Sequence, residues 1–152
     1  MELRTRTTVI VPHPIEAAFD RAIDSSSFPR VLLRYGPIPG VVAAEELNGG
    51  PAPGSRRRLK MSDGSVIEEE ITDLERPRRY GYHWLTRPKA PFGWLIKTGA
   101  AEWIFSEAGE QTSIDWRYTF QLTSPLAAPL AALVLLMFRG WMTKALETLG
   151  RA

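Results

Sequence analysis

A buried acid–base pair is the arrangement in this sequence that could most directly do chemistry. The sequence predicts strands at Ser55–Met61 and Val66–Leu74, joined into a hairpin by a turn at Asp63–Gly64. On the second strand Glu69 shares a face with apolar side chains, and Arg57 on the first strand could pair with it. A buried carboxylate is costly unless it is paired. Such a pair could hold a polar group of a ligand, or shift a pKa for acid–base catalysis.

The sequence favours a simpler interpretation of the same charges. Arg56–Arg58 and Lys60 lie opposite Glu68–Glu70, as expected for cross-strand pairs on a solvent-facing sheet surface. A register slip of one residue would exchange the two faces of the hairpin, so both interpretations stay open. The basic run is too short to indicate nucleic-acid binding, and the net charge of +2 points the same way.

The two histidines offer little further chemistry. His83 is the better candidate for a polar anchor or a general base. It is expected on the sheet face opposite Tyr82 and Trp84, however, so a surface or structural role is favoured. His13 lies in a turn between two prolines. The chain has no cysteine and no spacing of metal-ligand residues, so neither a metal nor another cofactor is predicted.

Aromatic residues gather on one face of three predicted strands, Arg79–Thr86, Ala100–Glu107 and Thr112–Leu122. They fit either a packed core or the wall of an apolar pocket. The pocket is favoured because tyrosine hydroxyl and tryptophan N–H groups need partners when they are buried. With three residues of the helix that follows, the predicted wall consists of Tyr80, Tyr82, Trp84, Trp103, Phe105, Trp116, Tyr118, Phe120, Leu133, Met137 and Trp141.

One long apolar helix is predicted after Ser124–Pro125, residues that suit the first positions of a helix. Its first half, Leu126–Phe138, carries no charge. That run is shorter than the ~20 residues of a membrane span, and charged residues follow it. A buried helix is therefore expected, and no transmembrane segment. Pro129 lies one turn inside, which predicts either a separate turn before it or a kink.

The rest of the chain supplies two more strands, two short helices and one long connection. Strands are predicted at Arg4–Val11 and Val41–Leu47, and helices at Ile15–Ile23 and Phe28–Tyr35, which makes seven strands in all. The segment Arg87–Gly99 is longer than a hairpin needs, so it is either a lid over the cavity or an irregular strand extension. The large apolar residues of this predicted lid are Phe92, Trp94 and Leu95.

Length and composition are those of one globular domain spanning residues 1–152. With 44% hydrophobic and 24% charged residues, the chain can bury a sizeable core while keeping a polar surface. The first residues lack the long apolar stretch and cleavage site of a signal peptide, so a cytoplasmic location is expected.

The order of these elements resembles the START-like superfamily, also called the SRPBCC or polyketide cyclase/dehydrase superfamily. Val11–Pro12 followed by Ile15–Phe19 is similar to the family's opening, and Asp63–Gly64 followed by Asp73–Tyr80 is similar to its middle. The resemblance implies an α+β helix-grip fold. In this fold a seven-stranded antiparallel sheet curls around a long C-terminal helix, with two short helices after the first strand. It also implies a cavity for an apolar molecule, and it carries over no catalytic residue.

Three functions follow as expectations. The first is binding of an apolar or amphipathic small molecule, of lipid, polyketide or aromatic type, between sheet and helix. The second is a polyketide cyclase or dehydratase in the same cavity, with Tyr82, Tyr118, Glu69 or His83 moving protons, although no catalytic motif is present. The third is an interaction module that forms a homodimer or touches a membrane surface through the apolar part of the last helix.

Overall fold

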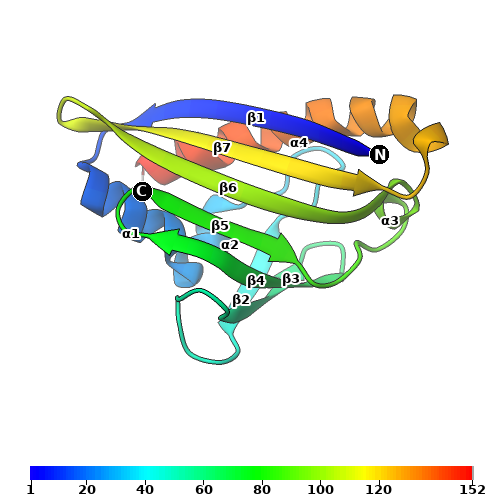
Figure 1. Cartoon of the computed structure of the whole chain (residues 1–152), viewed down its shortest axis with the longest axis horizontal. Helices are drawn as coiled ribbons and strands as arrows, with labels where there is room; N and C mark the ends of the chain where they lie inside the picture. Colours follow the sequence, from blue (N-terminus) through cyan, green and yellow to red (C-terminus); the bar gives the residue numbers. More distant parts are fainter. Residues whose placement is uncertain (152) are drawn as a thin grey trace.

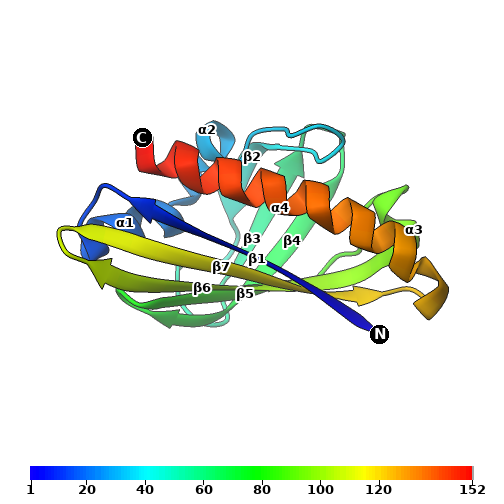
Figure 2. The ribbon, with the colours of Figure 1, turned by 90° about the horizontal axis from the view of Figure 1, so that it is seen from above.

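A single antiparallel sheet forms the body of the protein, for which a computed structural model describes residues 1–151. All seven predicted strands are present, in the spatial order β1-β7-β6-β5-β4-β3-β2. Figures 1 and 2 show this sheet curling around the long helix α4 (Ala128–Arg151), which confirms the predicted helix-grip. The strands are β1 (Glu2–Val11), β2 (Val41–Glu46), β3 (Arg56–Met61), β4 (Val66–Glu75), β5 (Arg79–Trp84), β6 (Ile96–Ala108) and β7 (Gln111–Leu122).

Two short helices, α1 (Ile15–Ile23) and α2 (Phe28–Val31), lie between β1 and β2 and close one end of the sheet (Figure 1). α1 begins directly after Pro14 and buries its apolar side, from which Phe19 packs edge-on against Phe105 at 5.1 Å between ring centroids. α2 is shorter than predicted, because after Val31 the chain leaves the helix and soon folds back in a small bridge.

The start of α4 resolves the alternatives that Pro129 left open. Pro125–Ala127 form a separate 3-10 turn, and the Ser124 hydroxyl accepts a hydrogen bond from the backbone N–H of Leu126 at 3.2 Å. α4 then begins at Ala128. Pro129 is therefore its second residue, where a missing N–H removes no helical hydrogen bond.

In the first half of α4 the buried face differs from the predicted one, whereas Trp141 in the second half is buried as expected. Leu133 was expected to face the sheet, but its side chain is exposed, as is that of Leu130. The buried residues of this half lie one or two positions further along the helix and are Ala131, Val134 and Leu135. The prediction was wrong about the phase because the first half of the helix is apolar on every side, so the 3.6-residue period does not single out one stripe.

The connection between β5 and β6 contains both predicted alternatives. β6 begins at Ile96, four residues earlier than expected, so the end of the segment does extend a strand. The part before it is a loop that holds a single helical turn, α3 (Phe92–Leu95). The Thr123 hydroxyl donates a hydrogen bond to the carbonyl of Trp94 at 2.6 Å, which ties this turn to the start of the last helix.

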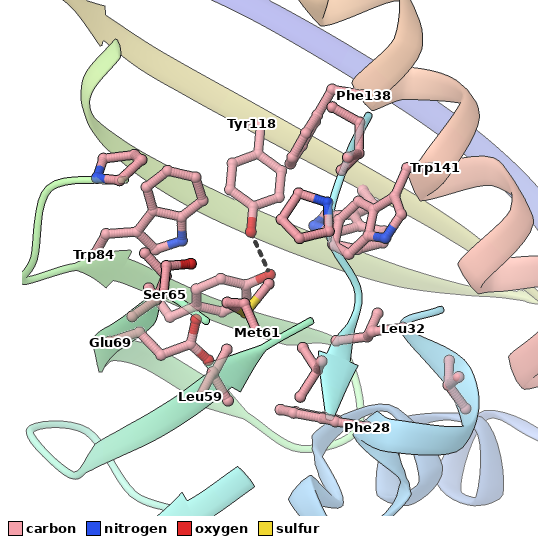
Figure 3. Close-up of a pocket in the computed structure, with 18 of the residues that line it drawn as sticks. Phe28, Leu32, Leu59, Met61, Ser65, Glu69, Trp84, Tyr118, Phe138 and Trp141 are labelled. Carbon is pink, nitrogen blue, oxygen red and sulfur yellow. Dashed lines mark hydrogen bonds between the residues drawn. The ribbon is translucent and has the colours of Figure 1, made fainter. Parts of the chain in front are cut away.

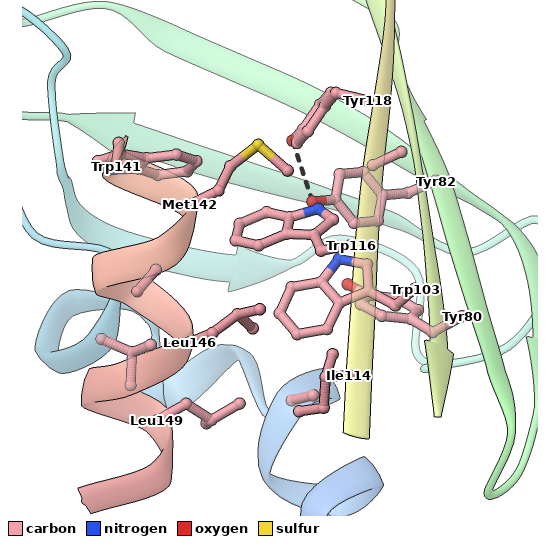
Figure 4. Packing of buried hydrophobic residues seen from close by; sticks show 14 of the residues in the cluster. Tyr80, Tyr82, Trp103, Ile114, Trp116, Tyr118, Trp141, Met142, Leu146 and Leu149 are labelled. Atoms are coloured by element: carbon pink, nitrogen blue, oxygen red, sulfur yellow. Dashed lines mark hydrogen bonds between the residues drawn. The ribbon is translucent and has the colours of Figure 1, made fainter. Parts of the chain in front are cut away.

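The core lies between α4 and the inner faces of β5, β6 and β7 (Figure 4). Trp116 is its largest fully buried side chain. Its ring lies 4.4 Å from that of Trp103 and 5.6 Å from that of Trp141 on α4, measured between centroids. Aromatic pairs at such distances add to the stabilisation from burial alone.

Candidate functional site

A cavity opens between the sheet, α4, the short helices and the loop that carries α3 (Figure 3). It contains about 1150 Å³ of empty space, including the part open to solvent. Exposed Asp63 and Lys89 mark its opening, and the Lys89 ammonium donates a hydrogen bond to the carbonyl of Asp63 at 3.3 Å across it. Of the predicted wall residues, eight line the cavity: Tyr80, Tyr82, Trp84, Trp103, Trp116, Tyr118, Phe120 and Trp141.

Three residues predicted for the wall do not line this cavity. Phe105 is buried but packs against Phe19 of α1, so it belongs to the closed end of the core. Leu133 lies on the exposed face of α4, and Met137 is only partly buried against the core. The structure places other apolar residues in the wall, among them Phe28, Leu59, Ile67, Val134, Leu135 and Phe138.

Strand alternation alone would have identified two of these additional wall residues. Leu59 and Ile67 are direct cross-strand partners, and each is two residues from Arg57 or Glu69 on the same face. Phe28 carries no such signal, because only the packing of α2 under the sheet brings it to the cavity. The three α4 residues follow from the phase of the helix, which the sequence does not fix.

Arg57 and Glu69 form the buried pair that was the less favoured interpretation of the hairpin. They are direct partners in the β3–β4 register, and the Arg57 guanidinium donates a hydrogen bond to the Glu69 carboxylate at 2.5 Å. Both side chains are buried. The simpler interpretation holds for their neighbours on the outer face, where Arg58 pairs with Glu68 at 3.0 Å.

The Arg57 guanidinium is enclosed by further groups of the chain. It donates a second hydrogen bond to the Tyr80 hydroxyl. Its central carbon lies 5.0 Å from the ring centroid of Phe28, 5.4 Å from that of Tyr80 and 5.6 Å from that of Tyr82, distances suited to cation–π contacts. Glu69 lines the cavity, whereas Arg57 lies behind it. Arg57 therefore supports the polar wall rather than forming it.

Burial and the neighbouring charges shift the pKa values of Glu69 and Arg57 in opposite directions. Burial raises the pKa of Glu69, and the charge and hydrogen bond of Arg57 counter this only in part. For Arg57 burial lowers the pKa, but Tyr80 and Glu69 more than offset it, so the net pKa is raised and the guanidinium stays charged. Burial also raises the pKa of Tyr80 and Tyr82 well above the usual value, so both are neutral hydroxyls.

The polar atoms around the cavity are mostly hydrogen-bond donors. The hydroxyls of Tyr82 and Tyr118 form a hydrogen bond with each other at 3.0 Å, drawn as a dashed line in Figure 4. Within the described part of the chain, the buried indole N–H groups of Trp116 and Trp141 have no hydrogen-bond partner. A buried donor without a partner is costly. A ligand with acceptor oxygens could satisfy these groups.

His83 is not a polar anchor of the cavity. As expected from strand alternation, it lies on the outer face, where its Nε2 is 3.1 Å from a carboxylate oxygen of Glu70. His13 is tied to the end of α4 instead, with its Nε2 3.0 Å from the carbonyl of Gly150. Among residues 1–151, no group of three or more His, Asp or Glu side chains could hold a metal ion.

The predicted lid is only partly a lid. Phe92 lines the cavity together with Lys89 of the same loop. Leu95 packs against the core instead, and the side chain of Trp94 points into solvent. The lid prediction was therefore wrong for Trp94, because the single turn of α3 places residues two apart on different sides of the loop.

A model of the family described as "Polyketide cyclase / dehydrase and lipid transport" matches residues 2–152. The chain belongs to this family. A comparison with curated protein sequences gave no match. Membership in the family confirms the resemblance drawn from the sequence, and it supports hydrophobic ligand binding or cyclase activity in general terms.

Solved structures similar to this family member have the same fold at low sequence identity. The di-domain ARO/CYC BexL from the BE-7585A biosynthetic pathway is 18% identical with a TM-score of 0.74, and the match covers 99% of this chain and 49% of BexL. This chain thus spans about half the length of that protein. Ara h 8.0201 is 13% identical, with a TM-score of 0.71 and full coverage of both chains. TTHA0849 from Thermus thermophilus is 20% identical, with a TM-score of 0.73 and coverage of 98% and 95%.

The family fold explains one side of the long apolar helix. The segment Pro125–Arg151 is long and apolar enough to cross a membrane by length and composition, with a mean hydropathy of 1.6 over its most apolar part. In this fold α4 packs along one side of the sheet, and Met142, Ala145 and Leu146 are fully enclosed. Core helices of globular proteins also pass this test when they are mostly buried, but only 33% of the most apolar part of this segment is buried. The fold therefore accounts for the enclosed side of α4 and not for its exposed apolar side.

Proposed function

We propose that the protein binds an apolar or amphipathic small molecule, of lipid, polyketide or aromatic type, in the cavity between sheet and α4. The observation that carries this proposal is the character of the wall. Aromatic and aliphatic side chains make up most of it, while Glu69 and the unpaired indole N–H groups of Trp116 and Trp141 provide a few polar contacts. Such a combination is typical of small-molecule sites. The donors favour a ligand with carbonyl, phenol or carboxylate oxygens. A cytoplasmic location belongs to the same proposal.

Filling the cavity should remove ligand binding. Val134→Trp adds an indole to the α4 wall, whereas Leu133→Trp adds the same group to the exposed face one residue away. We expect the dye 1-anilinonaphthalene-8-sulfonate to bind the wild type, and its affinity to fall at least about tenfold in Val134→Trp, a loss of roughly 1.4 kcal/mol. Leu133→Trp should bind as the wild type does. Fluorescence titration measures both.

Two results of this titration would contradict the cavity as the binding site. One is equal dye affinity in both variants, and the other is no binding to the wild type. Overpacking can destabilise a protein, so the thermal unfolding of Val134→Trp is measured first. Ile67→Phe, a smaller addition to the opposite wall, is the second variant if Val134→Trp does not fold. Native mass spectrometry of the purified protein, followed by extraction, would identify any ligand that it carries.

A cyclase or dehydratase is a second candidate because Glu69 faces the cavity. Its pKa is raised by burial, and carboxyl groups in such surroundings can donate protons. The hydroxyls of Tyr82 and Tyr118 lie on the same wall. This candidate requires that Glu69 carries a proton at a pH where an exposed glutamate does not.

The pH dependence of stability tests whether Glu69 holds that proton. With a pKa raised above the ordinary 4.5, the folded state binds more protons than the unfolded state as the pH rises from there. The free energy of unfolding contributed by Glu69 therefore falls with rising pH, up to its folded-state pKa. Glu69→Gln lacks this contribution. We expect the stability of the wild type relative to Glu69→Gln to decrease above pH 4.5 in urea unfolding. A relative stability that increases instead would make Glu69 a permanent anion and exclude it as an acid.

A further inference from the structure

Leucine side chains form an exposed ridge along the first half of α4 and the turn before it. The exposed fractions are 92% for Leu126, 56% for Leu130 and for Leu133, and 67% for Leu136. These residues are three or four positions apart, so they lie on one side of the helix. Single exposed leucines need no explanation, but a contiguous group of them marks a surface that contacts something apolar.

A further exposed apolar side chain, that of Trp94, belongs to α3, which lies beside the start of this leucine ridge. The Trp94 side chain is 71% exposed, although tryptophan is among the residues that gain most from burial. The hydrogen bond from the Thr123 hydroxyl to the carbonyl of Trp94 holds α3 beside the chain segment that leads into α4. In Figure 2, α3 and the first turn of α4 lie together at the same end of the molecule.

The cavity does not account for the leucine ridge. Val134, Leu135 and Phe138 on the other face of α4 line the cavity, whereas the ridge residues point away from it. A helix that served only the cavity would carry polar residues on its outer face. The second half of α4 does so, with exposed Lys144 and Glu147.

Two chain segments contain the leucine ridge and Trp94, and every charged side chain in these two segments is positive. Residues 87–101 and 123–146 contain no aspartate or glutamate. On neighbouring β1 the acid Glu2 is accompanied by Arg4, which lies 3.6 Å from it. The basic residues of the two segments are all exposed: Arg87, Lys89, Lys97, Arg139 and Lys144.

We propose that the leucine ridge and Trp94 dock on the surface of an anionic lipid bilayer. The leucines and the indole would enter the interface, and the surrounding cations would contact the lipid headgroups. A second copy of the chain fits this surface less well, because a two-fold contact would bring the same positive charges together. Docking does not depend on a ligand in the cavity. Phe92 and Lys89, on the loop that carries α3, would hold the cavity opening near the bilayer.

Sedimentation with lipid vesicles tests this proposal. We expect the wild type to bind vesicles of equimolar phosphatidylcholine and phosphatidylglycerol, more weakly at high salt, and to bind vesicles of phosphatidylcholine alone at least about tenfold less. The double variant Leu130→Glu/Leu133→Glu should lose this binding. The control Val42→Glu/Val66→Glu places the same two charges at exposed apolar residues of β2 and β4 and should bind as the wild type does.

Several results would overturn the proposal. They are no binding of the wild type to the anionic vesicles, equal binding to both kinds of vesicle, and equal binding of the double variant. A lipid-free dimer that the double variant dissociates, seen by analytical ultracentrifugation, would assign the ridge to a second copy. The double variant must also keep its affinity for 1-anilinonaphthalene-8-sulfonate, which separates loss of docking from loss of the cavity.

Discussion

Replacing Arg57 with methionine should lower the free energy of unfolding by about 3–5 kcal/mol, the range for removing one partner of a buried ion pair. The substitution removes the hydrogen bonds to Glu69 and Tyr80 and leaves the Glu69 carboxyl buried without its cation. The pKa of Glu69 would then rise further, because burial raises it and the charge of Arg57, which lowers it, is gone. Urea unfolding of both proteins at neutral pH measures the loss.

Two further variants make this prediction specific to the buried pair. In Arg57→Met/Glu69→Met both charges are replaced by apolar side chains, and most of the lost stability should return. Arg58→Met removes the neighbouring arginine of the same strand, which pairs with Glu68 at the surface. That change should cost no more than about 1 kcal/mol. If Arg57→Met and Arg58→Met cost the same, the pair is not buried in solution.

Trp116→Ala should lower the free energy of unfolding by about 3–5 kcal/mol, as large truncations in a core do. Trp116 is 1% exposed and contacts the rings of Trp103 and Trp141. Because it also lines the cavity, the space left behind would join a cavity that already exists, and neighbouring side chains could not collapse into it fully. Denaturant unfolding followed by circular dichroism measures the change.

Trp94→Ala is the matched control, since it makes the same truncation at an exposed tryptophan. Its effect should stay within about 0.5 kcal/mol. A loss of less than about 1 kcal/mol for Trp116→Ala would mean that the aromatic wall is loosely packed in solution. A large loss for Trp94→Ala would show that this side chain is packed, which would also remove it from the docking surface.

The sheet could be predicted from the sequence because strands carry their own markers. Turns such as Asp63–Gly64 delimit them, and alternation assigns the faces, so the sequence predicts seven of the wall residues on β5, β6 and β7. The Arg57–Glu69 pair depended on the hairpin register. In a hairpin with arginines and glutamates on both faces, charge pattern alone could not choose between the two registers.

The helix and the loop were harder to predict for a physical reason. A period can be read only where polar residues interrupt apolar ones, and the start of α4 has none, so Leu133 was assigned to the wall in place of Val134. For the apolar residues of the α3 loop the sequence predicts either a lid or an irregular strand extension. Their actual directions depend on one helical turn that begins after Pro91, and composition does not show such a turn.

The pairing of β1 with β7 has a consequence for how the protein folds. Glu2 lies opposite Gln121, so β1 can pair with β7 only after most of the chain has been synthesised. The β3–β4 and β6–β7 hairpins can form locally and fast, whereas closing β1 onto β7 is a long-range step of the kind that slows folding. Until then the edge of β7 that β1 covers stays open to other chains. We therefore expect early folding intermediates to contain the central hairpins, with β1 and α4 joining last and α4 completing the cavity.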